Sequence, residues 1–216
     1  VSNPFLNIYS YAITVPNTIF NCFGTALSTV VIPIYAGHIA NGREKEALEL
    51  IKEDNPLPAS IGRVCPHPCE EKCRRKFLEG AVSICALKRF AAEDNMDYFP
   101  ECEGLNGKTV AVVGAGPAGL SCAYFLAQKG YKVTVFDAQT HGGGMLRYGI
   151  PQYRLPKDIL DREIKCIENM WVEFKYSHKL GRDITVESLK SQYDAVFLAI
   201  GAWKAMGLGC PGDNSV

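Results

Sequence analysis

The chain has 216 residues and a formal net charge of zero, with 47% hydrophobic and 21% charged residues. This composition is typical of a globular protein with a core of its own, and it argues against disorder and fibrous repeats. Because there is no basic excess, no overall field attracts nucleic acid or an anionic membrane surface, and we expect neither as a partner.

No charged residue occurs before Arg43. The most apolar window, from Thr18 to Gly37, is interrupted by Asn21, Gly24 and Pro33 and has no basic flank. We therefore predict neither a transmembrane helix nor a signal peptide. Without a secretion signal, the nine cysteines indicate a reducing compartment. We expect a cytoplasmic protein in which some cysteines bind metal.

Two amphipathic helices are predicted in the first half of the chain. REKEALELIKED, at 43–54, has apolar residues on one face and alternating charges on the other, and VSICALKRFAAE, at 82–93, repeats the helical spacing. Between them lies the polar stretch GRVCPHPCEEKCRRK, at 62–76. We predict a loop there, because Pro66 and Pro68 prevent a regular helix across the first two cysteines.

A βαβ unit is predicted after an acidic linker at 94–106. KTVAVVG, at 108–114, is a continuous β-branched run that suits a strand buried on both faces of a parallel sheet. A helix at 118–129 and a second strand at 131–137 follow. The pattern further predicts a helix with Pro156 at its first position that runs to about Asn169, strands at 171–174 and 194–200, and a short helix at 186–191.

A Gly-x-Gly-x-x-Gly motif follows the first of these strands and opens the helix. Gly114 permits the tight turn, Gly116 lets the backbone approach a diphosphate, and Gly119 allows the helix to pack closely on the strand. The N–H groups and the dipole at the start of the helix then stabilise the phosphates. Asp137, at the end of the second strand, is expected to hold the ribose hydroxyls. Both NAD and FAD fit this loop.

Three cysteines, Cys65, Cys69 and Cys73, lie close together in the polar stretch. Soft thiolates suit an iron–sulfur cluster or zinc, and unligated thiols are the third possibility. A flavin-linked dithiol is disfavoured by the spacing. The histidines form no pattern with a Ser or Cys nucleophile, so no catalytic triad is expected. The cysteines after Cys73 are predicted to be small buried hydrophobes or idle thiols: Cys85, Cys102, Cys122, Cys166 and Cys210.

The sequence resembles the flavoprotein family that includes the small subunit of bacterial glutamate synthase and the N-terminal half of dihydropyrimidine dehydrogenase. The matching segments are NPLPASIGRVCPHPCEEKC, VSICALKRFAAE, VAVVGAGPAGL, GGGMLRYGIPQYRLPKDILDREI and YDAVFLAIGA. The resemblance implies an α/β fold in two domains. A small α-helical iron–sulfur domain, residues 1–104, would precede an incomplete Rossmann-type FAD-binding βαβ domain, residues 105–216. It also implies FAD rather than NAD in the Rossmann unit.

The resemblance, carried over by position, implies a set of FAD contacts: Val64, Gly114, Ala115, Gly116, Pro117, Ala118, Asp137, Met145, Arg154 and Leu180. The motif adds Gly119 to this set. The glycine run after the second strand adds Gly143 and Gly144, where the backbone must pass close to the cofactor. Arg154 is the charged group with an obvious role beside a phosphate or flavin oxygen, and the alternative is a solvated charge beside a helix.

The resemblance also implies cluster ligands, because this region of the related proteins holds two interleaved 4Fe-4S clusters. Cys22, Cys65 and Cys69 would serve one cluster, with Lys88 at the position of its non-cysteine ligand, although a protonated Lys cannot ligate iron. Cys73 would belong to the other cluster, whose remaining ligands are absent from the chain. One cluster on Cys22, Cys65, Cys69 and Cys73 is the alternative, so we expect one cluster at most.

The function implied is that of an electron-transfer module in an NAD(P)H-dependent oxidoreductase. FAD would take a hydride from NAD(P)H and pass electrons singly toward iron–sulfur centres, with no catalytic side-chain acid or base. In the family a separate NADPH domain follows the Ala-Ile-Gly strand. We therefore expect a fragment or split subunit that is inactive alone and works with the remaining FAD/NADPH half, or with a partner subunit, in a larger redox complex. The alternative is a non-catalytic iron–sulfur or nucleotide-binding scaffold subunit.

Overall fold

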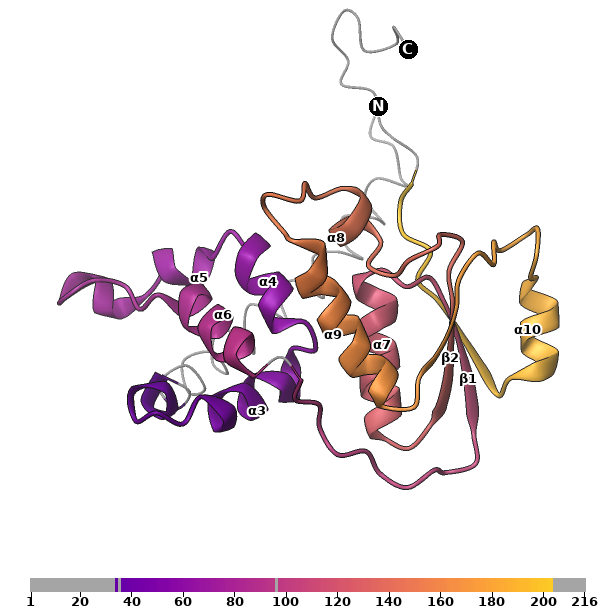
Figure 1. The fold of residues 1–216 in the computed structure, drawn as a ribbon, viewed down its shortest axis with the longest axis horizontal. Helices are drawn as coiled ribbons and strands as arrows, with labels where there is room; N and C mark the ends of the chain where they lie inside the picture. Colours follow the sequence, from indigo (N-terminus) through magenta and orange to yellow (C-terminus); the bar gives the residue numbers. More distant parts are fainter. Residues whose placement is uncertain (1–33, 35, 96, 204–216) are drawn as a thin grey trace, which may run out of the picture. The chain divides into compact units, whose positions relative to one another are not determined.

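The computed structural model describes residues 34, 36–95 and 97–203. These divide into two compact units, each described here by itself. The first unit comprises the described chain up to Asp54 together with Cys65–Asn95, and the second comprises Asn55–Val64 and the described chain from residue 97 onward. Figure 1 traces the elements of both. Among the residues so described, none of the helices is both long and apolar enough to cross a membrane.

The first unit is built on two helices, α3 (Glu44–Asp54) and α6 (Ile84–Asp94), which pack against each other. Their contact is formed by the buried side chains of Ala47, Ile51 and Ala91. The two amphipathic helices predicted from the apolar spacing are therefore confirmed.

No helix runs across Cys65 and Cys69, as predicted, but the segment at 62–76 is not a loop throughout, because it contains short helices. They are α4 (Pro58–Val64), α5 (Pro68–Glu71) and the 3-10 helix η2 (Arg74–Phe77). Pro68 does not prevent α5, since it lies in the first turn, where the N–H that it lacks would have no helical partner. Pro66 falls in the non-helical interval between α4 and α5.

A four-stranded parallel sheet forms the second unit, with the strand order β3-β2-β1-β4. The strands are β1 (Thr109–Val113), β2 (Lys132–Phe136), β3 (Glu173–Lys175) and β4 (Ala195–Leu198). The helices are α7 (Pro117–Gln128), α8 (Met145–Tyr148), α9 (Lys157–Asn169) and α10 (Val186–Gln192). The predicted α/β class and βαβ unit are confirmed, and α8 is an element that the sequence pattern did not indicate.

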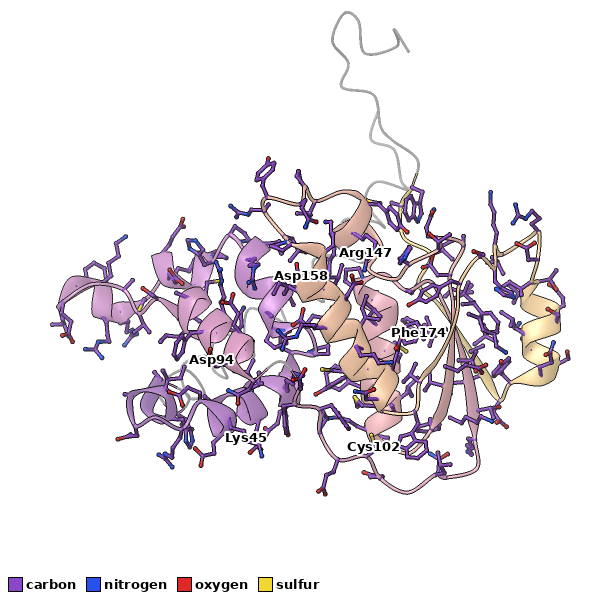
Figure 2. All side chains as sticks on the ribbon, viewed as in Figure 1. Lys45, Asp94, Cys102, Arg147, Asp158 and Phe174 are labelled. Atoms are coloured by element: carbon purple, nitrogen blue, oxygen red, sulfur yellow. The ribbon has the colours of Figure 1, made fainter. Side chains whose placement is uncertain are left out.

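Side chains alternate along β1 between the two faces of the sheet. Val110 and Val112 belong to the main core with α7 and α9, whereas Ala111 and Val113 pack with Leu189 of α10. In Figure 1, α7 and α9 accordingly cover one side of the sheet and α10 lies on the other. The side chains drawn in Figure 2 fill the space between the sheet and the helices α7 and α9.

Two predicted boundaries are shifted by local backbone geometry. Trp171 has a left-handed φ of 69°, so β3 begins only at Glu173. Pro156 has extended backbone and is the N-cap of α9, rather than its first helical residue. Both elements were predicted from the sequence, but their first residues depend on these dihedral angles.

A buried carboxylate attaches α4 to α9. Glu163 is 3% exposed, and its two oxygens accept hydrogen bonds from the backbone N–H groups of Ala59, at 2.7 Å, and Ser60, at 3.0 Å. The N–H groups in the first turn of a helix have no helical acceptor, and the helix dipole favours a negative charge there. Glu163 therefore fixes α4 to α9 within the second unit.

We expect Glu163→Gln to lower the free energy of unfolding by about 2 kcal/mol, because the amide leaves a buried N–H without a charged acceptor. Urea unfolding of the whole chain measures this change. Glu187→Gln, on the exposed first turn of α10, is the control and should change stability by less than about 1 kcal/mol. Equal losses for the two variants would contradict the role given to Glu163.

Candidate functional site

The turn between β1 and α7 requires glycine at two positions. Gly114 has a φ of 110°, and a Cβ on it would lie 2.2 Å from the carbonyl oxygen of Ala199. A Cβ on Gly119 would lie 1.8 Å from the carbonyl oxygen of Gly114. No side chain fits at either position, so the backbone itself forms the surface at the carboxyl end of β1.

Gly142, Gly143 and Gly144 form a second glycine run, which packs directly on this loop. A Cβ on Gly144 would lie 2.8 Å from the Cα atom of Gly116, and the N–H of Gly143 donates to the carbonyl of Ala115 at 2.7 Å. Gly116 is also the N-cap of α7, with no side-chain cap on the helix. The N-terminus of α7 therefore lies in a cradle made of backbone.

Asp137 holds the glycine loop with its carboxylate. One oxygen accepts from the N–H of Ala115 at 2.6 Å, and the other accepts from the N–H of Gln139 at 2.7 Å. A carboxylate has about four acceptor positions, so both oxygens can still accept from a hydroxyl group. The same side chain can shape the loop and bind a sugar.

Two adjoining cavities lie over this edge of the sheet. Both are lined by Gly114, Asp137, Ile200, Gly201 and Trp203. The smaller, of about 170 Å³, extends along the glycine loop to the start of α8, and the larger, of about 330 Å³, extends past the end of β2. Their position, at the carboxyl ends of parallel strands, is where ligands bind in open α/β sheets.

The cavities bring together many of the predicted contacts. Those that line one or both are Gly114, Gly116, Pro117, Ala118, Asp137, Gly144, Met145 and Leu180. Ala115, Gly119 and Gly143 are buried beneath the loop. Val64 is half-buried and packs against the main core, while Arg154 is exposed and lines neither cavity. A cofactor contact by Arg154 stays a prediction.

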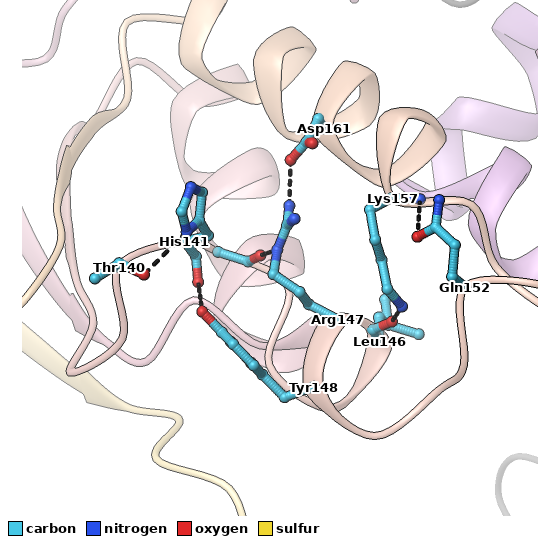
Figure 3. A network of polar contacts seen from close by, with 9 residues as sticks. Thr140, His141, Leu146, Arg147, Tyr148, Gln152, Lys157 and Asp161 are labelled. Carbon is cyan, nitrogen blue, oxygen red and sulfur yellow. Dashed lines mark hydrogen bonds and ion pairs between the residues drawn. The ribbon is translucent and has the colours of Figure 1, made fainter.

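Two basic residues that sequence reasoning missed fasten the second glycine run to α9 (Figure 3). The Lys157 ammonium donates to the carbonyls of Leu146, at 2.9 Å, and Ile150, at 2.6 Å. Arg147 donates to the carbonyl of Gly142 at 2.6 Å and is paired with Asp161. Burial, together with the Arg147 charge, lowers the pKa of Lys157. In the sequence, Arg147 and Lys157 look like ordinary solvated charges on helices, so nothing there indicated this role.

Aromatic side chains complete the surroundings of the cavities. The rings of Tyr148 and Trp203 lie 5.9 Å apart, and Trp203 lines both cavities. Beneath the second glycine run, burial raises the pKa of Tyr176 to about 12, so its hydroxyl remains protonated near neutral pH. Trp203 was missed because a tryptophan after a strand carries no motif.

The cysteine segment has free thiols in two surroundings. Burial raises the pKa of Cys85, and the nearby Cys65 adds to this shift. Burial raises the pKa of Cys69, and the neighbouring Cys65 adds to this shift. By contrast, backbone N–H groups, first that of Val82, lower the pKa of Cys73. Cys22 and Cys210 lie outside the described residues.

Metal binding depends on how these side chains are arranged. Within residues 34, 36–95 and 97–203, no group of three or more His, Cys, Asp and Glu side chains is arranged to hold a metal ion. Zinc needs about four ligands converging on one ion, and the described part of the chain offers no such set. An iron–sulfur cluster is different, because each of its irons takes one thiolate and the thiols surround the cluster.

Both halves of the chain match known protein families. Residues 20–98 match the model described as dihydropyrimidine dehydrogenase domain II, 4Fe-4S cluster. Residues 108–216 match the model described as pyridine nucleotide-disulphide oxidoreductase. These matches confirm the resemblance inferred from the sequence, and with it the pairing of a 4Fe-4S domain with a flavin-type oxidoreductase domain.

Individual relatives agree with the family matches. The chain is 43% identical to the beta subunit of an NADPH-Fe(3+) oxidoreductase of Geobacter sulfurreducens, over 89% of this chain and 30% of the relative. It is 40% identical to the beta subunit of an NADP(+)-dependent formate dehydrogenase of Moorella thermoacetica, over 85% of this chain and 29% of the relative. It is 38% identical to the NADPH glutamate synthase small chain of Escherichia coli, over 85% of this chain and 40% of the relative. The chain thus spans well under half the length of these relatives.

We expect Gly114→Ala to weaken FAD binding at least about tenfold, because its Cβ would meet the Ala199 carbonyl and displace the loop. Quenching of flavin fluorescence during a titration with FAD measures the affinity. Gly104→Ala, at a position with no atom near the new Cβ, is the matched control and should bind FAD like the unchanged chain. Undiminished binding by Gly114→Ala would show that the loop geometry is not needed.

We expect Lys157→Met to loosen residues 142–150, because two carbonyls lose their charged donor at a cost of about 1.5 to 3 kcal/mol each. Hydrogen exchange of the backbone amides should accelerate in that segment. Lys165→Met is the control on the same helix, since Lys165 is exposed and paired only with Glu168 in the described contacts. Unchanged exchange in Lys157→Met would show that Lys157 does not hold residues 142–150 in place.

The fold, the glycine loop and the two matches agree with one another. The second match, over residues 108–216, covers more than half of the chain. The parallel sheet, the glycine turn and the acid at the end of β2 are the structural features that a dinucleotide site of this kind requires. The chain belongs to the pyridine nucleotide-disulphide oxidoreductase family, with a 4Fe-4S cluster domain at its N-terminal side.

Proposed function

We propose that the chain is the FAD-binding electron-transfer module of an NAD(P)H-dependent oxidoreductase, which passes electrons between NAD(P)H, FAD and iron–sulfur centres. The observation that carries the proposal is the backbone cradle at the start of α7, with the Asp137 carboxylate beside it and two adjoining cavities over it. The names of the relatives support this class of reaction, since each name includes NADPH or NADP(+).

The residues present fit the adenosine and diphosphate parts of FAD. The free N–H groups in the first turn of α7 would bind the diphosphate, and Gly116 and Gly144 leave no side chain in its way. Asp137 would accept from the ribose hydroxyls through its unused lone pairs. The larger cavity, between Asp137 and Leu180, would take the adenosine end. Bound FAD supplies hydride acceptance and one-electron transfer.

The protein's own part in the reaction is then to position the flavin and to exclude water. The glycine loop and the second glycine run form one wall of the smaller cavity, while Met145 and Trp203 add apolar surface. The second glycine run is fixed by Arg147 and Lys157, as described above. No side-chain acid or base is needed, because the hydride passes between the two cofactors.

We propose further that a remaining FAD/NADPH part, on the same chain or on a partner subunit, covers the open edge of the sheet. β4 is one of the two edge strands of the described sheet, and Phe197 and Leu198 on it are 42% and 50% exposed. An apolar edge strand of this kind favours pairing with further structure. The greater length of the relatives supports the same view, as does their occurrence as subunits.

We propose a cytoplasmic location for this function. Every cysteine among residues 34, 36–95 and 97–203 is free, and several are close enough to interact. Free cysteines in such number are typical of reducing compartments, where iron–sulfur centres are also assembled.

Titration of the whole chain with FAD and with FMN tests the proposal. We expect FAD to bind more tightly than FMN, since FMN lacks the adenosine and the second phosphate. Asp137→Ala should weaken FAD binding about tenfold to a hundredfold through the loss of its charged acceptors, with little effect on FMN. Asp158→Ala, exposed in the first turn of α9, is the control and should leave both affinities unchanged. A folded chain that takes up no FAD would refute the proposal.

A further inference from the structure

Trp203 lies where the two cavities over the sheet meet. It follows Gly201, which has a left-handed φ of 67°, and it lines both cavities. Its ring centroid lies 5.9 Å from that of Tyr148 in α8. The Tyr148 hydroxyl donates to the carbonyl of His141 at 3.3 Å, next to the second glycine run (Figure 3). The indole is therefore supported by a side chain that is itself attached beside that run.

The polar edge of the indole lies near the chain that packs on the glycine turn. A Cβ on Gly201 would lie 3.8 Å from the Nε1 atom of Trp203. Just before Gly201, the backbone touches the turn, because a Cβ on Gly114 would lie 2.2 Å from the oxygen of Ala199 and 3.3 Å from the nitrogen of Ile200. No acceptor pairs with the Trp203 N–H among the residues that the structure describes. This N–H is available to a ligand beside the turn.

The smaller cavity has one side-chain hydrogen-bond donor among the described residues that line it. Most of these residues are glycine, alanine, proline, isoleucine or methionine, and none is lysine or arginine. The other two are Asp137, whose carboxylate accepts hydrogen bonds, and Trp203, whose indole N–H can only donate. A ligand rich in acceptors must therefore find its donors in the backbone and in Trp203.

A diphosphate is a ligand of this kind, because it is anionic and its oxygens accept hydrogen bonds. Hydrogen bonds to a charged acceptor are stronger than those between neutral groups. No basic side chain offsets the charge of the diphosphate along the described lining of the smaller cavity, and Asp137 adds a further negative charge. Each donor that reaches the diphosphate is therefore important for affinity.

We propose that the indole N–H of Trp203 donates a hydrogen bond to the diphosphate of the bound dinucleotide. The backbone N–H groups at the start of α7 bind the same group, so the diphosphate is held both by the glycine loop and by the chain that follows β4. The inference rests on the proposed FAD-binding function and deepens it, because it assigns a side chain to a task that the glycine motif gives to the backbone alone.

Trp203→Phe tests the assignment, because it keeps an aromatic ring and removes the N–H. The whole chain is titrated with FAD, ADP and adenosine. The variant should bind FAD and ADP about tenfold more weakly, and its binding of adenosine, which has no phosphate, should be unchanged. Trp171→Phe is the matched control, since Trp171 is the other tryptophan of the chain, is 83% exposed and lines neither of the two cavities. Circular dichroism should show that both variants are folded.

Nuclear magnetic resonance of the chain labelled with ¹⁵N observes the donor directly. The two tryptophans give two indole N–H signals, which the two variants assign. Addition of ADP should shift the Trp203 signal and slow its exchange with water, whereas adenosine should do neither. The Trp171 signal should stay unchanged with both ligands. A tryptophan that only supports the fold would not distinguish ADP from adenosine in this way.

The outcomes separate this inference from the FAD proposal. Equal FAD and ADP affinities in Trp203→Phe and the unchanged chain, with an unmoved Trp203 signal, would overturn the donor assignment and leave FAD binding intact. An equal loss of adenosine binding would also overturn it, because the packing of the ring would then explain the effect. If ADP moves the Trp203 signal but FAD does not bind, the FAD proposal fails and the donor assignment stands. A folded chain that binds neither FAD nor ADP would overturn both.

Discussion

The close approach of backbone to backbone at the carboxyl end of β1 determines the rest of the site. Gly114, Gly116, Gly119 and Gly144 each lie where a side chain would meet other backbone atoms or fill the cradle. Their lack of side chains exposes the N–H groups that begin α7. A diphosphate is the group for which such a surface is suited, because it is anionic and accepts many hydrogen bonds.

The remaining contacts hold this surface in place. Asp137 fixes the loop from the end of β2, and the second glycine run is fixed to α9 through Arg147 and Lys157. On the same helix, Glu163 holds α4, which ends just before Cys65. One helix therefore supports both the cofactor wall and α4 within the second unit.

Periodic patterns made the elements of the fold predictable, whereas contacts between distant residues did not. The β-branched run before Gly114 and the apolar spacing in α3 and α6 identified their elements correctly, and α9 was identified from Pro156 and the acidic residues near its start. The helices at the cysteines were missed because a proline in a first turn has the same sequence appearance as a helix breaker. In the site, the glycines and Asp137 carry a motif, but Arg147, Lys157 and Trp203 act through partners that the sequence alone does not reveal.

The most direct test of the central claim is backbone hydrogen exchange in the glycine loop with and without FAD. If the N–H groups at the start of α7 bind the diphosphate, FAD should protect the amides of Gly116, Ala118 and Gly119, and adenosine alone should not. The protection should be strongest around Gly116 and Ala118 and absent from α10, on the other side of the sheet. Saturating FAD that leaves exchange in this loop unchanged would contradict the account.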